Sequence, residues 1–213
     1  MVEKVEFMSL FITFEGGEGC GKSTQSRMLH RHLQMLAVTS VLIHEPGITR
    51  LGVRIRRLLK WSEELNVSPT AELLLFNAAR AQLVNEIIKP VLAKGTIIIC
   101  DRYADSTTAY QGYGRGLDMA TVRTANKIGM QGLLPDLTIL LDLPAEEGFR
   151  RKKGEKADRF EKEDPAFHRR VREGYLKLAE AEPKRWLVID ALNSKEEIAG
   201  IIWQRVSQML PGE

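Results

Sequence analysis

The chain has 213 residues, of which 44% are hydrophobic and 28% are charged, a composition that argues against disorder along its whole length. This length is typical of one domain and is sufficient to bury one sizeable hydrophobic core. The 31 basic and 28 acidic residues leave a formal net charge of only +3 and are mostly interspersed, so the chain lacks the pattern of a nucleic-acid-binding protein.

No stretch of the sequence has the pattern of a membrane or secretion signal. Apolar runs fall short of the ~18 residues of a membrane span, and the first residues lack the apolar stretch and cleavage site of a signal peptide. The two cysteines, Cys20 and Cys100, have no partner at metal-ligand spacing, which is typical of reduced thiols in a cytosolic protein. We therefore expect a cytoplasmic protein with no membrane partner, in which residues 1–7 form an N-terminal extension before the first strand.

Short apolar runs alternate with stretches of helical periodicity. The apolar runs predict strands at Leu10–Phe14, Ser40–His44, Thr96–Cys100, Leu137–Leu141 and Trp186–Ile189. The stretches between them predict helices at Lys22–Leu36, Thr70–Lys94 with a kink at Pro90, Asp118–Met130, Glu163–Glu180 and Ser194–Met209. Continuous apolar strands suit a parallel sheet that is buried on both faces. The alternation predicts an α/β fold, a five-stranded parallel sheet with helices on both faces and ligands at the carboxyl ends of its strands.

A glycine-rich segment joins the first predicted strand to the first predicted helix. Residues 16–23 read GGEGCGKS and fit the pattern G-x-x-x-x-G-K-[ST], in the strand–loop–helix context that this motif requires. Glycines let successive N–H groups turn toward an anion, Lys22 can reach the β- and γ-phosphates, and the Ser23 hydroxyl can ligate Mg²⁺. A glycine turn without a ligand is the weaker alternative, because strand, loop, lysine and hydroxyl coincide. The residues expected to bind ATP are Gly16, Gly17, Glu18, Gly19, Cys20, Gly21, Lys22, Ser23 and Thr24.

The phosphate loop does not specify the group that accepts the phosphoryl group. A GTPase needs the guanine-reading pattern N-K-x-D, and the nearest match, residues 126–129, reads NKIG and lacks the aspartate. The signature motifs of transport ATPases are not found in the sequence, and its length is about that of a small-molecule kinase.

Asp101 and Arg102 follow the strongest strand signal, TIIIC at residues 96–100. An aspartate at the carboxyl end of a strand beside the phosphate loop can orient Mg²⁺ or its water ligands. An arginine there can neutralise the transferring or the accepting phosphate. A surface ion pair is the alternative for this pair taken alone. We therefore expect Ser23 and Asp101 at the metal, and Lys22, Asp101 and Arg102 among the catalytic residues.

The segment DRYADSTTAYQGYGRG at residues 101–116 closely resembles bacterial thymidylate kinases. The phosphate loop FEGGEGCGKST, Glu45-Pro46-Gly47, LFNAAR at residues 75–80 and DRFE at residues 158–161 also match that family in order, so the resemblance spans roughly residues 10–192. It implies one P-loop kinase domain over residues 1–213 with a short lid. It also implies transfer of the γ-phosphoryl group from ATP to dTMP with Mg²⁺, and a homodimer formed through helices.

The resemblance implies a role for each residue of the acceptor site. Phe76 would stack on thymine, and Arg80 would donate a hydrogen bond to thymine O4. Cytosine has an amino group at that position, which is also a donor, so it could not accept a hydrogen bond from Arg80. Arg102 would bind the phosphate of dTMP, and Tyr110 would press on the sugar. The full expected set is Glu18, facing the 3′-OH, with Arg56, Phe76, Arg80, Arg102, Ser106, Tyr110 and Gln111, near the base. Without the resemblance, the two aromatic residues could belong to the core and Arg80 to a solvated helix face.

The segment FRRKKGEKADRF at residues 149–160 would be the lid, although composition alone fits an exposed charged loop equally well. Family members with glycine at the position of Gly19, where others carry arginine, use a lid arginine to neutralise the transferring phosphoryl group. Arg151 is the first choice for this role, before Arg150 and Arg159, and Lys153 adds to the basic lid.

One stretch departs from the family pattern, because His44 stands before Glu45-Pro46-Gly47 where an arginine is common. Arg50 or Arg56 could replace that charge.

Two other functions stay open from the sequence. One is a related nucleotide or nucleoside kinase with a different acceptor. The other is a nucleotide-binding module without phosphoryl transfer, which the combination of Lys22, Ser23 and Asp101 argues against.

Overall fold

The structure is a computed structural model that describes residues 9–62, 65–152, 154 and 157–210. The expected extension at residues 1–7 and the lid residue Lys153 lie outside the described residues. Among the described residues, no helix is long and apolar enough to cross a membrane.

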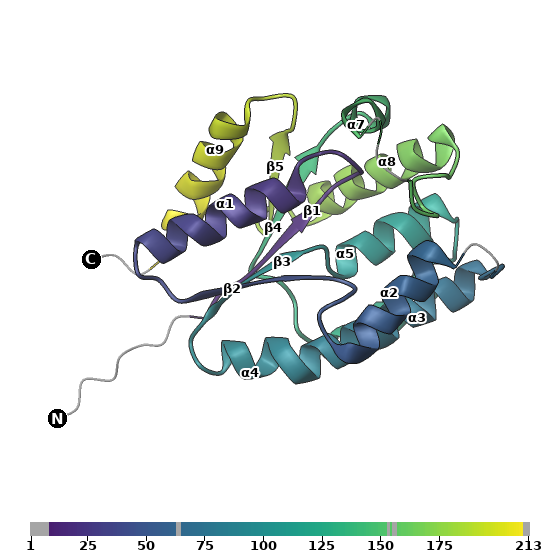
Figure 1. Cartoon of the computed structure of the whole chain (residues 1–213), viewed down its shortest axis with the longest axis horizontal. Helices are drawn as coiled ribbons and strands as arrows, with labels where there is room; N and C mark the ends of the chain where they lie inside the picture. The colour runs from purple at the N-terminus through teal and green to yellow at the C-terminus, as the bar shows by residue number, and fades with distance from the viewer. Residues whose placement is uncertain (1–8, 63–64, 153, 155–156, 211–213) are drawn as a thin grey trace.

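The centre of the fold is a five-stranded sheet in the order β2-β3-β1-β4-β5 (Figure 1). All paired strands run parallel, with bounds β1 Phe11–Glu15, β2 Ser40–His44, β3 Ile97–Asp101, β4 Leu137–Asp142 and β5 Trp186–Asp190. The expected α/β fold with a parallel sheet is confirmed. The chain moves from β1 toward β2 and β3 on one side and later crosses to β4 and β5 on the other, so the strand order reverses at β1.

Helices cover both faces of the sheet. They are α1 Lys22–Met35, α2 Arg50–Trp61, α3 Pro69–Leu83, α4 Lys89–Leu92, α5 Ala104–Thr107, α6 Met119–Met130, α7 Ala145–Arg151, α8 Pro165–Ala181 and α9 Lys195–Ser207, with π-helical segments η1 Val84–Ile88 and η2 Thr108–Gly114. On one face, α1 and α9 lie side by side (Figure 1). On the other face, α3 and η1 contribute Leu83, Val84 and Ile88 to a second core with Phe11 and Ile98.

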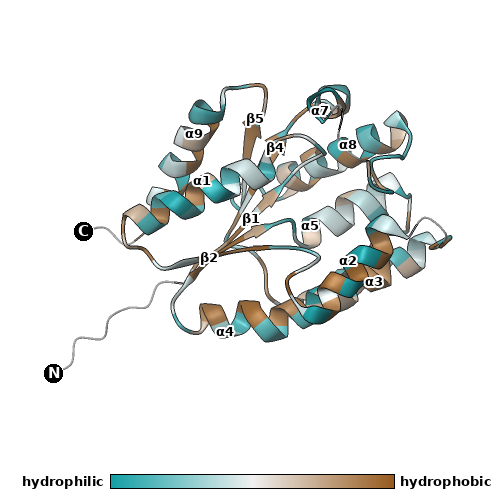
Figure 2. Ribbon diagram, viewed as in Figure 1, coloured by the Kyte–Doolittle hydropathy of each residue, from teal (hydrophilic) through white to brown (hydrophobic). Residues whose placement is uncertain are grey.

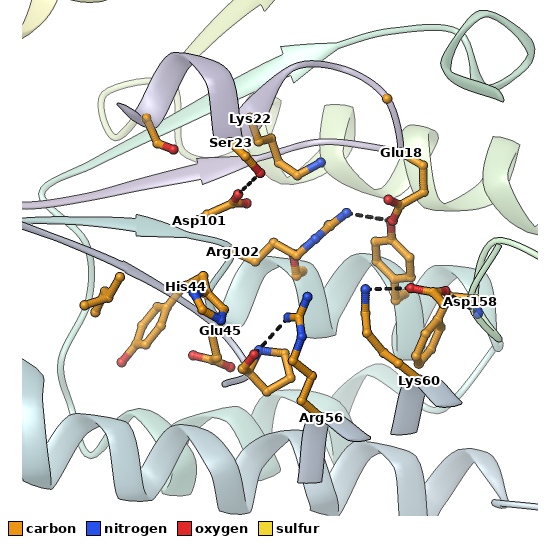
Figure 3. A pocket seen from close by; sticks show the side chains of 18 of the residues that line it. Glu18, Lys22, Ser23, His44, Glu45, Arg56, Lys60, Asp101, Arg102 and Asp158 are labelled. Carbon is orange, nitrogen blue, oxygen red and sulfur yellow. Dashed lines mark hydrogen bonds and ion pairs between the residues drawn. The ribbon is translucent and has the colours of Figure 1, made fainter. Parts of the chain in front are cut away.

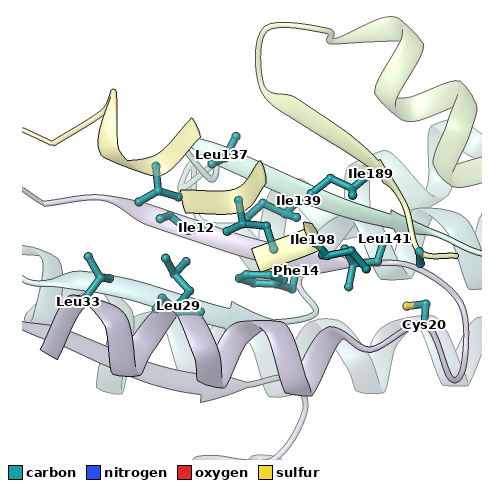
Figure 4. Close-up of a cluster of buried hydrophobic side chains, with 14 of the residues drawn as sticks. Ile12, Phe14, Cys20, Leu29, Leu33, Leu137, Ile139, Leu141, Ile189 and Ile198 are labelled. Atoms are coloured by element: carbon teal, nitrogen blue, oxygen red, sulfur yellow. The ribbon is translucent and has the colours of Figure 1, made fainter. Parts of the chain in front are cut away.

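The strand period of two divides the apolar side chains between these cores. Ile12 and Phe14 point toward α1 and α9, where they pack with Leu29, Leu33 and Ile198 (Figure 4). Phe11 points the other way and meets the Tyr103 ring edge-on at 4.9 Å. Because both faces are covered, the strands read as the continuous apolar runs seen in the sequence.

The predicted helix at Thr70–Lys94 needs correction. It begins at Pro69, where the Ser68 side chain accepts from the Ala71 amide, and it is interrupted by η1 rather than at Pro90. A proline ring collides with the carbonyl four residues earlier, here Glu86, and that residue lies inside the π-helical turn. The irregularity therefore comes one turn before the proline.

Helices α2, α5 and α7 were not predicted. Thr49 caps α2 by accepting from the Gly52 amide, and α2 turns Ile55 and Leu59 into the core while its arginines face outward or into the cleft described below. The helix α5 continues directly into η2, so residues 104–114 form one irregular helical segment after β3.

The centre of the sheet should dominate stability. Ile139 on β4 is fully buried, so Ile139→Ala should lower the free energy of unfolding by about 2–5 kcal/mol. Val188 on the edge strand β5 is 46% exposed, so Val188→Ala, the control, should cost under about 1 kcal/mol. Urea denaturation measures both values, and equal losses would contradict this assignment of the core.

Candidate functional site

A cleft of about 750 Å³ opens at the carboxyl ends of the strands, where the strand order reverses. Its size lies within the roughly 300–1,000 Å³ range of small-molecule sites. Side chains from the phosphate loop, β2, β3, α2, α3, α5, η2 and the lid region converge on it (Figure 3). It is therefore the candidate ligand site.

The phosphate loop forms one wall of the cleft. Gly21 adopts a left-handed conformation with φ 94° at the N-terminus of α1 and has no side chain to cap that helix. The positive end of the α1 dipole thus faces the loop. Lys22 folds back over the loop, where its ammonium donates to the carbonyl oxygens of Gly16 at 3.1 Å and Gly17 at 2.6 Å. A helix end and an ammonium at one loop make an anion-binding site.

Ser23 and Asp101 meet at the base of this loop. The Ser23 hydroxyl donates to the Asp101 carboxylate at 2.5 Å (Figure 3). These hard oxygen ligands fit Mg²⁺, which takes one or two protein oxygens and completes its shell with phosphate and water. Among the described residues, no group of three or more His, Cys, Asp or Glu side chains could form an all-protein metal cage.

The helix α7, whose last residues begin the expected lid segment, rests directly on the phosphate loop. A Cβ atom added at Gly19 would lie 2.2 Å from the Gly148 carbonyl oxygen, and one added at Gly148 would lie 2.1 Å from the Glu18 carbonyl oxygen. Gly19 also has φ 67°, which disfavours any side chain. An arginine at position 19 therefore does not fit beside α7 in this arrangement.

Arg102 lies at the centre of the cleft. Its guanidinium donates to the Glu18 carboxylate at 2.7 Å, and its carbon lies 5.1 Å from the centre of the Tyr110 ring. It also donates to Gly16 O at 3.1 Å and to the hydroxyls of Ser106, Tyr110 and Tyr175 at 3.2 Å.

Burial disfavours the charge on Arg102, but Tyr110 and Glu18 outweigh it and hold the pKa of Arg102 well above its usual value. Burial likewise opposes the charge on Glu18, yet Arg102 and Lys22 keep the pKa of Glu18 well below its ordinary range. Both groups are therefore charged at neutral pH.

Arg80 lies in the interior and not on a solvated face, with 1% of its surface exposed. It forms an ion pair with Glu45 at 2.6 Å and donates to Asn77, Asn126, Thr107 and the Tyr103 carbonyl oxygen. Because an arginine has only five N–H donors, these contacts engage its full capacity. The longest of them is the 3.3 Å contact with Tyr103 O.

Phe76 and Tyr110 line the cleft together with Arg80. Phe76 is partly buried and its ring lies 5.7 Å from the Phe160 ring, whereas Tyr110 is buried and donates to Glu18 at 2.8 Å. Both aromatic residues therefore belong to a third hydrophobic cluster, which includes Leu59 and Phe167, and at the same time to the cleft wall.

Arg56 enters the cleft from α2 and donates to the Pro46 carbonyl oxygen at 2.9 Å (Figure 3). It lies beside His44, whose pKa is lowered by burial and by the Arg56 charge, so the imidazole is neutral at pH 7. Of the two arginines considered for the missing family charge, Arg56 lines the cleft, whereas Arg50 lies on the outer surface of α2.

Among the lid cations, Arg151 faces the cleft and donates to Ala191 O at 2.9 Å. Arg150 is 74% exposed and pairs with Glu147, outside the cleft lining. Arg159 points away from the cleft, toward Leu59 O and Glu72. Of these three arginines, Arg151 is the one that lines the cleft.

The structure also separates Gln111 from the cleft. Gln111 is buried and donates to Glu72 at 2.8 Å. Conversely, several lining residues were missed as site residues, and Lys60, Thr107 and Lys152 are among them. Lys60 pairs with Asp158 at 2.6 Å, and the signal that could have found it is the helical period of α2, which places it one turn after Arg56.

The contact between α7 and the phosphate loop generates a prediction. Gly148→Ala should push the loop and α7 apart and raise the dissociation constant for ATP roughly tenfold to a hundredfold. Gly200→Ala is the matched control, because its Cβ would meet nothing within 4 Å on α9, and it should leave ATP binding unchanged. Calorimetric titration measures both, and unaltered binding by the Gly148 variant would contradict the tight contact.

Comparisons with known proteins agree on one family. The family model described as thymidylate kinase matches residues 14–202. The chain is 57% identical over 203 residues to the thymidylate kinase of Dehalococcoides mccartyi, covering 95% of this chain and 98% of that protein. It is 47% identical over 202 residues to the thymidylate kinase of Geotalea uraniireducens, covering 92% and 95% of the two chains.

A solved structure gives the same result. The crystal structure of thymidylate kinase from Ehrlichia chaffeensis superposes with a TM-score of 0.76 at 34% identity, covering 94% of this chain and 99% of that one. The chain belongs to the thymidylate kinase family.

Proposed function

We propose that this chain transfers the γ-phosphoryl group of ATP to dTMP, forming ADP and dTDP for the synthesis of dTTP. The observation that carries the proposal is that one cleft holds both the phosphate loop with Lys22 and an acceptor wall with Phe76, Arg80 and Arg102. A nucleotide-binding module without an acceptor would have no need of the second wall.

Catalysis rests on positioning and on neutralising charge, since no covalent nucleophile is needed. A phosphate oxygen of dTMP attacks the γ-phosphorus, the bond to the β-phosphate oxygen of ATP breaks, and ADP leaves. Lys22 lies beside the loop that would hold the β- and γ-phosphates, and the Arg102 guanidinium contacts the same loop at Gly16 O and Glu18 (Figure 3). Arg151 would approach the transferring group from the lid. Mg²⁺, held by Ser23 and Asp101, would offset the charge of the ATP phosphates.

The acceptor wall explains the preference for thymine. Phe76 offers an apolar face for the base. Arg80 is oriented by Glu45, and a thymine O4 atom would replace its longest contact, the one with Tyr103 O. Cytosine presents a donor at the same place, and an unpaired buried donor costs about 1–3 kcal/mol. The methyl group that separates dTMP from dUMP is worth only about 0.8 kcal/mol of burial.

The test is a coupled ADP-release assay with dTMP, dUMP, dCMP and dGMP as acceptors. We expect dTMP to be the best acceptor, dUMP to follow within about tenfold in kcat/KM, and dCMP to fall further behind, by the energies just given. Lys22→Ala should lower kcat at least about a hundredfold. Lys94→Ala, a change at an exposed lysine outside the cleft, is the control. A better acceptor than dTMP would favour a related kinase, and ATP binding without transfer would favour a binding module.

The same proposal includes the organisation of the enzyme. It treats residues 1–213 as one kinase domain whose lid spans about residues 149–160. It places the enzyme in the cytoplasm, supported by Cys20 and Cys100, which are free and buried.

The enzyme would act as a homodimer through its outer helices. Large hydrophobic residues are exposed on three neighbouring helices, with Leu51, Val53 and Trp61 on α2, Leu74 on α3 and Ile128 on α6. Figure 2 shows apolar stretches along α2 and α3. Leu74 is 58% exposed and Ile128 is 70% exposed. Apolar surface gathered in this way is typical of a protein interface.

Leu74→Glu should convert the dimer to a monomer, because a buried unpaired carboxylate at the interface is costly. Leu192→Glu is the matched control, since Leu192 is 57% exposed in the turn after β5, away from these helices. Sedimentation velocity distinguishes the two species. A monomeric unaltered chain, or a dimeric Leu74 variant, would contradict the interface.

A further inference from the structure

Glu15 is a buried carboxyl group for which the reaction just described has no role. It is the last residue of β1, directly before the phosphate loop, and none of its surface is exposed. Within the described part of the chain, no ion pair satisfies it. Burying a carboxylate without a cation partner is expensive, so its presence needs an explanation.

Hydrogen bonds connect Glu15 to Arg102 through two hydroxyl groups. Its Oε1 accepts from the Tyr103 amide at 2.8 Å. Its Oε2 accepts from the Ser106 hydroxyl at 2.5 Å and from the Tyr175 hydroxyl at 3.0 Å. The Arg102 guanidinium donates to both of those hydroxyl oxygens at 3.2 Å. The hydroxyl groups therefore stand between an obligate acceptor and an obligate donor.

The direction of these bonds depends on the charge of Glu15. A carboxylate only accepts, so Ser106 donates to it, and Tyr175 donates either to it or to the Ser106 oxygen 2.8 Å away. In both cases the two hydroxyl protons point away from Arg102 and leave lone pairs for this arginine, which only donates. A protonated carboxyl, or an amide at the same place, would donate to those hydroxyls instead. Their protons would then turn toward Arg102 and oppose its guanidinium.

We propose that Glu15 is a positioning residue: its carboxylate fixes the Ser106 and Tyr175 hydroxyls as acceptors for Arg102 and so aims the guanidinium at the phosphate of the acceptor nucleotide. This inference rests on the proposed function, in which Arg102 binds that phosphate. Glu15 is fully buried and does not line the cleft, so it would act through the arginine.

The surroundings of Glu15 make the positioning of Arg102 sensitive to pH. Burial, with the nearby charge of Asp105, raises the pKa of Glu15 to about 7, although the bonds from Ser106 and Tyr103 and the charge of Arg102 oppose the rise. Several other titratable and charged groups face Glu15 from the neighbouring elements. They are Asp105 on α5 with its partner Arg185, Cys100 on β3, Arg102 and Tyr103 directly after β3, and Tyr175 on α8. The ionised form thus prevails above about pH 7, and acceptor binding should weaken below it.

Ionisation of Glu15 should affect the stability of the fold in the opposite direction to its effect on acceptor binding. Because the folded pKa lies above the ordinary value of 4.5, the folded state favours the protonated carboxyl. The contribution of Glu15 to stability therefore falls as the pH rises from about 4.5 to about 7. Removing the charge should not destabilise the fold at pH 8, and this separates a positioning role from a structural one.

The experiment compares the unaltered enzyme with Glu15→Gln between pH 6 and pH 9. At pH 8 we expect the KM for dTMP to rise roughly tenfold or more, the KM for ATP to change less than about threefold, and the melting temperature not to fall. The variant should also lose the rise in dTMP KM that the unaltered enzyme shows below pH 7. Ionisation of the dTMP phosphate, with a pKa of about 6, is common to both enzymes and cancels in their ratio.

Two further variants keep the test decisive. Tyr175→Phe removes one hydroxyl and should raise the dTMP KM in the same direction by a smaller factor. Asp105→Asn, a change at another buried carboxyl, removes a negative neighbour of Glu15. It should shift the acid limb of the dTMP profile to lower pH and leave the KM at pH 8 unchanged.

An unchanged dTMP KM in folded Glu15→Gln would overturn the proposal, as would equal losses of ATP affinity, dTMP affinity and melting temperature. If that variant does not fold, an unchanged KM in Tyr175→Phe together with an unshifted Asp105→Asn profile would overturn it. An unaltered enzyme that does not phosphorylate dTMP would refute the proposed function itself, so the two failures are distinguishable.

Discussion

The arrangement of the cleft at the carboxyl end of the sheet depends on the backbone conformation and the contacts of Arg102. Its backbone has φ 70°, a left-handed conformation that costs a residue other than glycine about 1–3 kcal/mol. The amide of Arg102 nevertheless donates to Phe14 O at 2.9 Å, so the hydrogen bonding between β1 and β3 continues one residue beyond the strand. This conformation accompanies a side chain that enters the cleft, toward Glu18 of the phosphate loop. The sheet therefore supplies the energy that keeps an unfavourable backbone where a central cation is needed.

The other cations of the cleft are held by groups that a phosphate could replace. Lys22 donates to loop carbonyl oxygens, Arg56 to a carbonyl oxygen, and Lys60 pairs with Asp158. Each partner satisfies the cation without ligand, which avoids the cost of crowding unpaired positive charges in one place. Since two nucleotides together bring several negative charges, exchanging these partners for phosphate oxygens would order the cleft around its substrates. The three cations thus lie in the cleft without ligand, and bound phosphates would fix their final positions.

The strands and the phosphate loop could be predicted from the sequence because each follows from a pattern within a short stretch of residues. The apolar runs follow from burial of both sheet faces, and the loop follows from the spacing of glycine, lysine and serine. The segment 104–114 has no such pattern, since its π-helical turn breaks the usual period and its polar residues are buried. Family resemblance supplied the residues there but not their contacts. It could not indicate that Arg80 is saturated by protein acceptors, or that Gln111 faces Glu72.

The contact between Gln111 and Glu72 connects η2 with α3, two segments that are far apart in the sequence. Glu72, Phe76 and Arg80 follow one another at intervals of four residues, so they share one face of α3. Phe76 and Arg80 line the cleft, whereas the buried Glu72 accepts from Gln111 of η2 and from Arg159 at the end of the lid. One face of α3 thus contributes to the cleft wall and holds Arg159 at the same time. A displacement of α3 would therefore change the cleft wall together with the contact between Glu72 and Arg159.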